Sequence, residues 1–179
     1  MIDNFLKAGL LQFGVFGKQE TPFKLNFQLL PSYPHILQEI AQKTLPVVQG
    51  MDRLLCEASA VPLGVAISLA SNIPLVYSLG TDQAGVYDLI GAYDVGHPAA
   101  LILHQWDDAK HPALIEKAAR VGLEIKHIVT LFDFGQPADY EITPIFNFET
   151  VIRDLAARGV IPQMQADTVI AWNQKRHNF

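Results

Sequence analysis

Cysteine is nearly absent from this chain of 179 residues, because Cys56 is the only one. A single thiol excludes an internal disulfide and every zinc motif that is built on paired cysteines. We expect this thiol to be buried and inert. The lack of disulfides favours a reducing compartment, and the sequence therefore predicts a cytoplasmic protein.

Charge is also scarce, and positive charge most of all. Charged residues make up 17% of the chain, against about 25% in an average soluble domain. The 13 Lys and Arg residues against 18 Asp and Glu residues give a net charge of −5. No positive field attracts polyanions, so we expect no nucleic-acid partner.

An uninterrupted membrane span is missing too. Residues 58–81 carry no charge and are long enough to cross a bilayer, but Pro62 and Pro74 interrupt them. Residues 1–16 carry Asp3 and Lys7 and lack the basic start and the cleavage site of an export signal. We therefore expect no membrane partner.

Apolar residues are plentiful, and their spacing predicts the fold class. At 50% hydrophobic residues the chain can bury a core, and its length predicts one domain over residues 1–179. Periodicity predicts strands over residues 23–30, 54–58, 75–78, 99–104, 125–132 and 142–146. It predicts helices over residues 3–13, 36–48 (with Ser32 as a cap), 62–70, 112–121, 148–158 and 163–175.

Strand and helix alternate through most of the chain, which is typical of an α/β protein with a parallel central sheet. In such sheets, ligands bind beyond the carboxyl ends of the strands. The loops that begin near Glu57, near Leu79, after His104 and after Asp133 are therefore the places where we expect a site.

Short apolar and turn-forming segments follow one another in a characteristic order. They are residues 13–16 (FGVF), 29–34 (LLPSYP), 61–68 (VPLGVAIS), 73–77 (IPLVY) and 91–96 (GAYDVG). In order and spacing these segments resemble orotate phosphoribosyltransferase over almost the whole chain. The resemblance implies the type I phosphoribosyltransferase fold, with a parallel sheet flanked by helices and a small hood of N-terminal and C-terminal segments. It also implies a homodimer.

The reaction that the resemblance implies joins orotate to phosphoribosyl pyrophosphate with magnesium, giving orotidine monophosphate and pyrophosphate. A pyrophosphate leaving group needs cations and N–H donors, and ribose hydroxyls need acidic acceptors. After its third core strand, the family has two adjacent acids, two apolar residues and a Thr-Thr-Gly-Gly turn around the 5′-phosphate. Here residues 103–112 read LHQWDDAKHP, so the pattern is lost. Asp107 and Asp108 fall near the phosphate position, where two carboxylates would repel it.

Other charged positions of the family are lost as well. The pyrophosphate-binding Arg-Lys pair and its mobile loop are replaced by residues 79–85 (LGTDQAG), which contain no cation. A turn that contacts pyrophosphate reads Glu57-Ala58-Ser59-Ala60, which adds a negative charge. The Asp-Arg pair that meets orotate reads Asp133-Phe134, which removes a guanidinium. Lys18 is the remaining cation of a shortened N-terminal loop. Lys24 lies on the strand that follows, and the alternation of that strand does not show whether its side chain faces the same site.

These losses lead to the hypothesis of a catalytically degenerate orotate phosphoribosyltransferase-like protein that serves as a ligand-binding or interaction module. A nucleotide or a pyrimidine-like small molecule is the expected ligand. The alternative is an active orotate phosphoribosyltransferase of pyrimidine synthesis, in which Lys18, Asp107 and Asp108 replace lost groups and Mg²⁺ is the cofactor. The candidate residues of the crevice are Lys18, Glu57, Ser59, Trp106, Asp107, Asp108, Lys110 and Phe134.

A third, weaker hypothesis is a metal site. His104, Asp107, Asp108 and His111 lie close together in the sequence, and their side chains suit Zn²⁺, Mn²⁺ or Ni²⁺. The simpler interpretation is that His104 makes a hydrogen bond at a strand end, Asp107 and Asp108 cap the next helix, and His111 is exposed.

Two aromatic side chains of the crevice leave alternatives open. Trp106 either fills the core, which we favour, or stacks on a ligand. Phe134 either plugs the orotate pocket, which we slightly favour, or reshapes it for an uncharged ligand.

Overall fold

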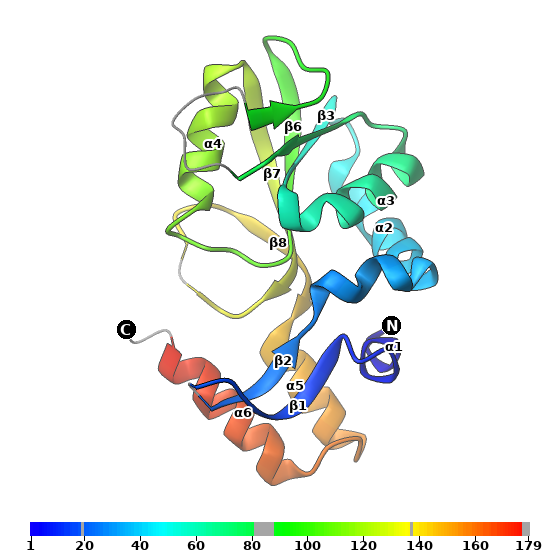
Figure 1. Ribbon diagram of the computed structural model, residues 1–179, viewed down its shortest axis with the longest axis vertical. Helices are drawn as coiled ribbons and strands as arrows, with labels where there is room; N and C mark the ends of the chain where they lie inside the picture. The colour runs from blue at the N-terminus through cyan, green and yellow to red at the C-terminus, as the bar shows by residue number, and fades with distance from the viewer. Residues whose placement is uncertain (19, 81–87, 137, 177–179) are drawn as a thin grey trace.

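A six-stranded sheet forms the centre of the computed structural model, which describes residues 1–18, 20–80, 88–136 and 138–176 (Figure 1). Its strands are β3 (Arg53–Glu57), β4 (Leu75–Ser78), β5 (Leu89–Ile90), β6 (His97–Leu103), β7 (Leu123–Asp133) and β8 (Ile142–Asn147). They lie in the order β5-β4-β3-β6-β7-β8. Every neighbouring pair is parallel except β4 and β5. The predicted parallel sheet is confirmed.

Helices cover both faces of this sheet. α2 (Pro34–Val48) and α3 (Val61–Ser71) pack together on one face, and α4 (His111–Arg120) packs against β7 on the other (Figure 1). Leu54 and Cys56 of β3 join the core on one face, and Leu55 joins the core on the other. Because both faces are covered at the centre of the sheet, β3 and β6 each contain a continuous buried apolar run. Burial also raises the pKa of the Cys56 thiol to about 12, and the expectation that this thiol is buried is confirmed.

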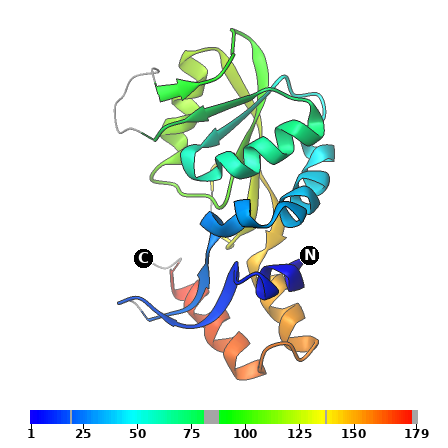
Figure 2. The same cartoon turned by 45° about the vertical axis from the view of Figure 1, so that its right-hand side comes forward.

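A smaller part, which we call the hood, consists of the antiparallel strands β1 (Leu11–Phe16) and β2 (Thr21–Leu25) with helices α5 (Phe148–Ala157) and α6 (Gln163–Arg176). Figure 2 shows it below the sheet, built from segments near both ends of the chain. Phe23 of β2 anchors the hood, since its ring centroid lies 4.5 Å from that of Phe148 and 5.5 Å from that of Trp172. The hood that the resemblance implies is therefore present.

The N-terminal segment differs from its prediction. The helix expected over residues 3–13 is wrong in its second half, because α1 (Ile2–Lys7) ends early. Gly9 then adopts a left-handed conformation with φ of 67°, which glycine allows at little cost. The apolar residues that follow form β1, where Leu11 pairs with Leu25.

The strand predicted over residues 23–30 is also too long. β2 ends at Leu25 because the next residue, the buried Asn26, turns the chain and donates a side-chain hydrogen bond to the Gly9 carbonyl at 2.8 Å. A 3₁₀ helix (Phe27–Ser32) follows. The predicted Ser32 cap is wrong, since α2 begins at Pro34 with Tyr33 as its N-cap residue.

The order of the strands creates a switch point beside β3. From β3 the chain passes to β4 on one side and later to β6 on the other, and Cys56 pairs with Ile102 between them. Open α/β sheets bind ligands outside the carboxyl ends of the strands at such a point. Glu57 and His104 lie there. Among the described residues, no helix is long and apolar enough to cross a membrane.

Candidate functional site

A cavity of about 830 Å³ lies between the carboxyl ends of the strands and the hood. Its volume is in the range of small-molecule sites. The strand-end residues that line it are Glu57, Ser59, His104, Gln105 and Phe134. The hood and the adjoining 3₁₀ helix contribute Phe16, Gly17, Thr21, Phe23, Lys24, Leu25, Phe27, Gln28 and Trp172.

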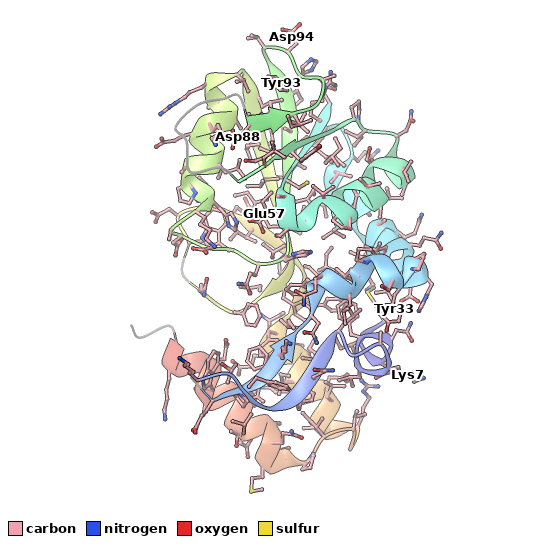
Figure 3. All side chains as sticks on the ribbon, viewed as in Figure 1. Lys7, Tyr33, Glu57, Asp88, Tyr93 and Asp94 are labelled. Atoms are coloured by element: carbon pink, nitrogen blue, oxygen red, sulfur yellow. The ribbon has the colours of Figure 1, made fainter. Side chains whose placement is uncertain are left out.

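Glu57 ends β3 and carries the negative charge of the cavity (Figure 3). Its Oε1 accepts a hydrogen bond from the Ser59 hydroxyl at 2.5 Å, and its Oε2 lies 3.7 Å from Nε2 of His111. The imidazole of His111 lowers the pKa of Glu57 to about 2, with the Ser59 hydroxyl helping, although burial opposes this shift. Glu57 is therefore an anion throughout the physiological pH range.

His104 follows β6 and is the buried polar side chain of the cavity wall. It is 7% exposed, and its ring stacks on Phe27 with centroids 4.5 Å apart. Burial lowers the pKa of His104 to about 4, although the Glu57 carboxylate opposes this shift, so the imidazole is neutral. Within the described parts of the chain, its ring nitrogens have no hydrogen-bond partner.

His111 begins α4 and is buried, with only 3% of its surface exposed. The interpretation that it is exposed is wrong, because its ring packs 5.2 Å from Trp106 and faces Glu57. Its Nδ1 accepts a hydrogen bond from the Asp107 N–H at 2.9 Å. The ring proton is thereby assigned to Nε2, which points toward Glu57.

The loop between β6 and α4 uses its own backbone donors. The N–H of Asp107 bonds to His111, and the N–H of Ala109 bonds to Oδ1 of Asp107 at 3.0 Å. The N–H groups of Lys110 and His111 both bond to the Asp107 carbonyl. Asp107 thus closes a turn before α4, whose N-cap residue is Lys110 without a side-chain cap, so neither aspartate caps the helix as the simpler interpretation assumed. Four donors of this loop are therefore occupied within it.

Trp106 belongs to the core between the sheet and α4. It is 6% exposed and its Nε1 donates to Oδ1 of Asp108 at 2.5 Å, which satisfies the polar end of the indole. Tyr140 packs on it with ring centroids 5.2 Å apart. The interpretation of Trp106 as a core residue is confirmed.

The predicted metal site does not form. His104 faces Phe27 and the cavity, whereas His111 faces Glu57 and Trp106. Asp107 accepts from its own turn and pairs with Lys110, and Asp108 accepts from Trp106, as described above. No group of three or more metal-ligating side chains gathers among the described residues. Proximity in the sequence misled here, because the loop turns these four side chains in different directions.

Phe134 is a wall of the cavity and also part of the hood's aromatic cluster. Its ring lies 4.7 Å from Phe148 and 6.1 Å from Phe23, and it is 6% exposed. Asn173 of α6 donates to its carbonyl at 2.9 Å. Phe134 therefore joins the hood to the sheet, and the cavity stays open beside it.

The remaining candidate residues are separated from the cavity lining. Lys18 lies exposed in the turn between β1 and β2, and Lys110 is exposed and pairs with Asp107 at 3.3 Å. The loop expected to have lost its cations, residues 79–85, lies outside the described residues from position 81 on.

Sequence reasoning missed most of the aromatic lining and left Lys24 open. Phe16, Phe27 and Trp172 lie far apart in the sequence and meet only because the hood folds back on the strand ends. Lys24 lines the cavity although Phe23 and Leu25 beside it also do, so strand alternation was no guide. A cluster of aromatic residues in both terminal segments was the one available signal.

Solved structures that are similar to this one include a UMP synthase and several phosphoribosyltransferases. The UMP synthase of Leishmania donovani is similar at a TM-score of 0.80 and 23% identity, with 96% of this chain and 40% of the synthase covered. The orotate phosphoribosyltransferase of Francisella tularensis is similar at 0.70 and 19% identity over 97% of each chain. The chain has the type I phosphoribosyltransferase fold. An adenine phosphoribosyltransferase of Thermoanaerobacter pseudethanolicus shares this fold at a TM-score of 0.60 and 12% identity, over 83% of this chain and 100% of that one.

The type I phosphoribosyltransferase fold is evident here from structure and not from overall sequence similarity. The sequence matches no protein-family profile, and no curated protein matches it. The chain spans about two fifths of the length of the synthase. At these identities the likeness establishes the fold, and the chemistry has to be argued from the residues of the cavity.

Proposed function

We propose that this protein of the phosphoribosyltransferase fold is catalytically degenerate and binds a small molecule in the cavity between the strand ends and the hood. The observation that carries the proposal is the loop after β6. A phosphate cradle needs free N–H groups that converge on the anion. Here the N–H groups of Asp107, Ala109, Lys110 and His111 are bound within the loop.

The electrostatics of the cavity support the same proposal. Glu57 is an anion at the end of β3, and His104 beside it is neutral. Lys24 is the single lysine or arginine among the described residues that line the cavity. A pyrophosphate group at the strand ends would therefore meet a carboxylate without a compensating cation.

The size of the loss favours degeneracy over adaptation. Each charged hydrogen bond to a phosphate or carboxylate is worth about 1.5 to 3 kcal/mol. Such contacts act as a unit, so their energies are not summed. The loss of even one such bond corresponds to a factor of about 10 or more in affinity or rate.

A coupled assay with orotate, phosphoribosyl pyrophosphate and Mg²⁺ tests the proposal, with an active orotate phosphoribosyltransferase as the positive control. We expect no orotidine monophosphate above the background without enzyme. Thermal unfolding should show no stabilisation by phosphoribosyl pyrophosphate, whereas a true ligand raises the melting temperature. Substantial turnover that is lost on heating the protein would refute degeneracy.

An active orotate phosphoribosyltransferase is the second candidate, and the position of the cavity at the switch point of the sheet favours it. Its Mg²⁺ would need free acidic oxygens near Asp107 and Asp108. Asp107 accepts from the Ala109 N–H and pairs with Lys110, and Asp108 accepts from Trp106, so the two carboxylates are directed to different partners. No group of three or more metal-ligating side chains gathers among the described residues, so we assign the metal no role.

A homodimer is a further part of the proposal and rests on the resemblance. Sedimentation velocity on the purified chain should give a species of twice the monomer mass. If the protein is monomeric and none of orotate, orotidine monophosphate, other nucleotides or divalent metals stabilises it, a role in binding a protein partner is favoured instead.

A further inference from the structure

We propose that the cavity takes a planar aromatic ligand that directs a cationic amidine-type or amino edge at Glu57 and carries no phosphate or carboxylate. This inference deepens the proposed function and rests on it. Three features of the cavity carry it: its flat aromatic walls, the unused acceptors of Glu57 and the unpartnered imidazole of His104.

The walls of the cavity favour a flat ligand. Five of its lining side chains are aromatic rings, from Phe16, Phe23, Phe27, Phe134 and Trp172. Phe27 and His104 already stack with their ring planes only 20° apart. Phe23 and Phe134 lie nearly parallel at 16°. Rings of this kind bind planar groups by stacking, and they attract cations through their negative faces.

Glu57 has acceptor capacity that its own neighbours do not use. A carboxylate has about four lone-pair positions. Ser59 occupies one of them, and the separation of 3.7 Å between Oε2 and His111 is longer than a normal hydrogen bond. The side chain keeps 30% of its surface exposed and lines the cavity. A ligand with two N–H groups on one edge fits these free positions.

His104 provides the independent observation that this wall of the cavity is prepared for a ligand. It is more than nine-tenths buried, and its ring nitrogens bond to none of the described residues. A neutral imidazole offers one N–H donor and one acceptor. A polar ligand edge in the cavity would supply partners for these nitrogens.

The charge of the site selects against anions. Glu57 is ionised and His104 is neutral, so the strand-end wall has a net negative charge. Phe134 contributes an apolar ring to this wall and no charge. Lys24 is exposed and belongs to the opposite, hood side of the cavity. In a partly desolvated site, a cation beside a carboxylate is favoured more strongly than in water.

Calorimetric titration with benzamidine and benzoate tests the inference, because the two probes have nearly the same shape and opposite charge. Benzamidine should bind with a Kd of about 1 mM or tighter. Benzoate should bind at least about tenfold more weakly.

Two variants locate the site. Glu57→Gln keeps the size of the side chain and should weaken benzamidine at least about tenfold without weakening benzoate. His104→Phe keeps the ring that stacks on Phe27, removes its nitrogens and should weaken benzamidine severalfold. Glu124→Gln, which removes an exposed carboxylate paired with Lys126 on β7, is the matched control and should bind like the unmodified chain.

The outcomes separate this inference from the proposed function. Absence of benzamidine binding, equal binding of the two probes, or a benzamidine affinity that Glu57→Gln leaves unchanged would each overturn the inference. The proposed function would survive those results as long as the coupled assay stays silent. Turnover of orotate in that assay would instead overturn the proposed function.

Discussion

Two carboxylates, those of Glu57 and Asp88, lie beside basic side chains of the same helix, α4, but in different surroundings. Its first residue, His111, faces Glu57 at the end of β3, and Lys117 on its later turns donates to Oδ2 of Asp88 at 2.7 Å. Glu57 opens onto the cavity, whereas Asp88 is 5% exposed. Figure 3 shows both, with Glu57 at the edge of the sheet nearer the hood and Asp88 farther from it.

The two carboxylates differ in their burial and in their hydrogen-bond partners. Burial by itself raises the pKa of Asp88, but hydrogen bonds from Lys117 and Ser78 outweigh this and bring the pKa below its ordinary value. Oδ1 of Asp88 is buried and has no partner among the described residues, so Lys117 carries most of the compensation. Glu57 keeps contact with solvent and free acceptors. We infer that the Asp88 pair matters for stability and that Glu57 matters for binding.

Breaking the buried ion pair between Lys117 and Asp88 should have the largest effect on the free energy of unfolding. Lys117→Met leaves Asp88 as a buried charge without its cation and should lower the free energy of unfolding by about 3 to 5 kcal/mol. Urea denaturation followed by circular dichroism measures this. The double variant Asp88→Asn with Lys117→Met should recover part of the loss, because it removes the charge as well.

Lys126→Met is the matched control for that experiment. Lys126 pairs with Glu124 at 2.8 Å, but both side chains are more than half exposed. Exposed pairs contribute little, so this variant should unfold like the unmodified chain. A Lys117→Met variant as stable as Lys126→Met would break the distinction between the two settings.

The second largest effect on the free energy of unfolding is expected from His104 in the cavity wall, when the pH is lowered. The pKa of His104 is lowered to about 4, so between about pH 6.5 and 4 the unfolded chain binds a proton that the folded chain does not. Stability is fully present above pH 6.5 and should fall by up to about 3 kcal/mol as the pH drops to 4. In His104→Phe this part of the pH profile of urea midpoints should flatten. A profile parallel to that of the unmodified chain would contradict the neutral, buried imidazole.

Removing the charge of Glu57 should lower the free energy of unfolding by less than either of the two preceding changes. Its pKa of about 2 lies below the ordinary value, so the carboxylate stabilises the fold above pH 4.5, and this contribution is lost as the pH falls toward 2. Glu57→Gln should lower the free energy of unfolding at pH 7 by about 1 kcal/mol, because the group is partly exposed. The difference from the unmodified chain should shrink in urea titrations near pH 3. A loss as large as that of Lys117→Met would show that Glu57 is structural.

The smallest effect is expected in the loop after β6. Lys110 pairs with Asp107 at 3.3 Å, and its side chain is 72% exposed. Lys110→Ala should change the free energy of unfolding by at most about 0.5 kcal/mol. The turn is held by the backbone acceptor and the side chain of Asp107, so Asp107→Ala should be clearly more destabilising in the same measurement.

Predictions from the sequence succeeded where local pattern and tertiary environment agree. Residues 75–78 were predicted as a strand and are β4, and the helix predicted over residues 163–175 ends within one residue of α6. The N-terminal segment failed because the apolar spacing of residues 3–13 suits a helix as well as a strand, and the Leu11–Leu25 pairing decides between them.

The residues of the candidate site also fall into those that the sequence placed correctly and those that it did not. Glu57, Ser59 and Phe134 were placed at strand ends by the βαβ order, and the cavity is there. The four residues of the predicted metal site were grouped by their closeness in the sequence, which a tight turn does not preserve. His111 was expected in solvent, since nothing near it in the sequence shows that Trp106 and Glu57 enclose it.

By itself, the sequence determined the parallel sheet and its buried strands, because these follow from residue type and order along the chain. Only the tertiary structure decided that His111 approaches Glu57, that His104 is buried unpaired against Phe27, and that aromatic residues from both ends of the chain close the cavity. The reason is physical. Ionisation and hydrogen bonding depend on which groups lie within a few ångströms and on how much water remains, and packing between distant segments sets both.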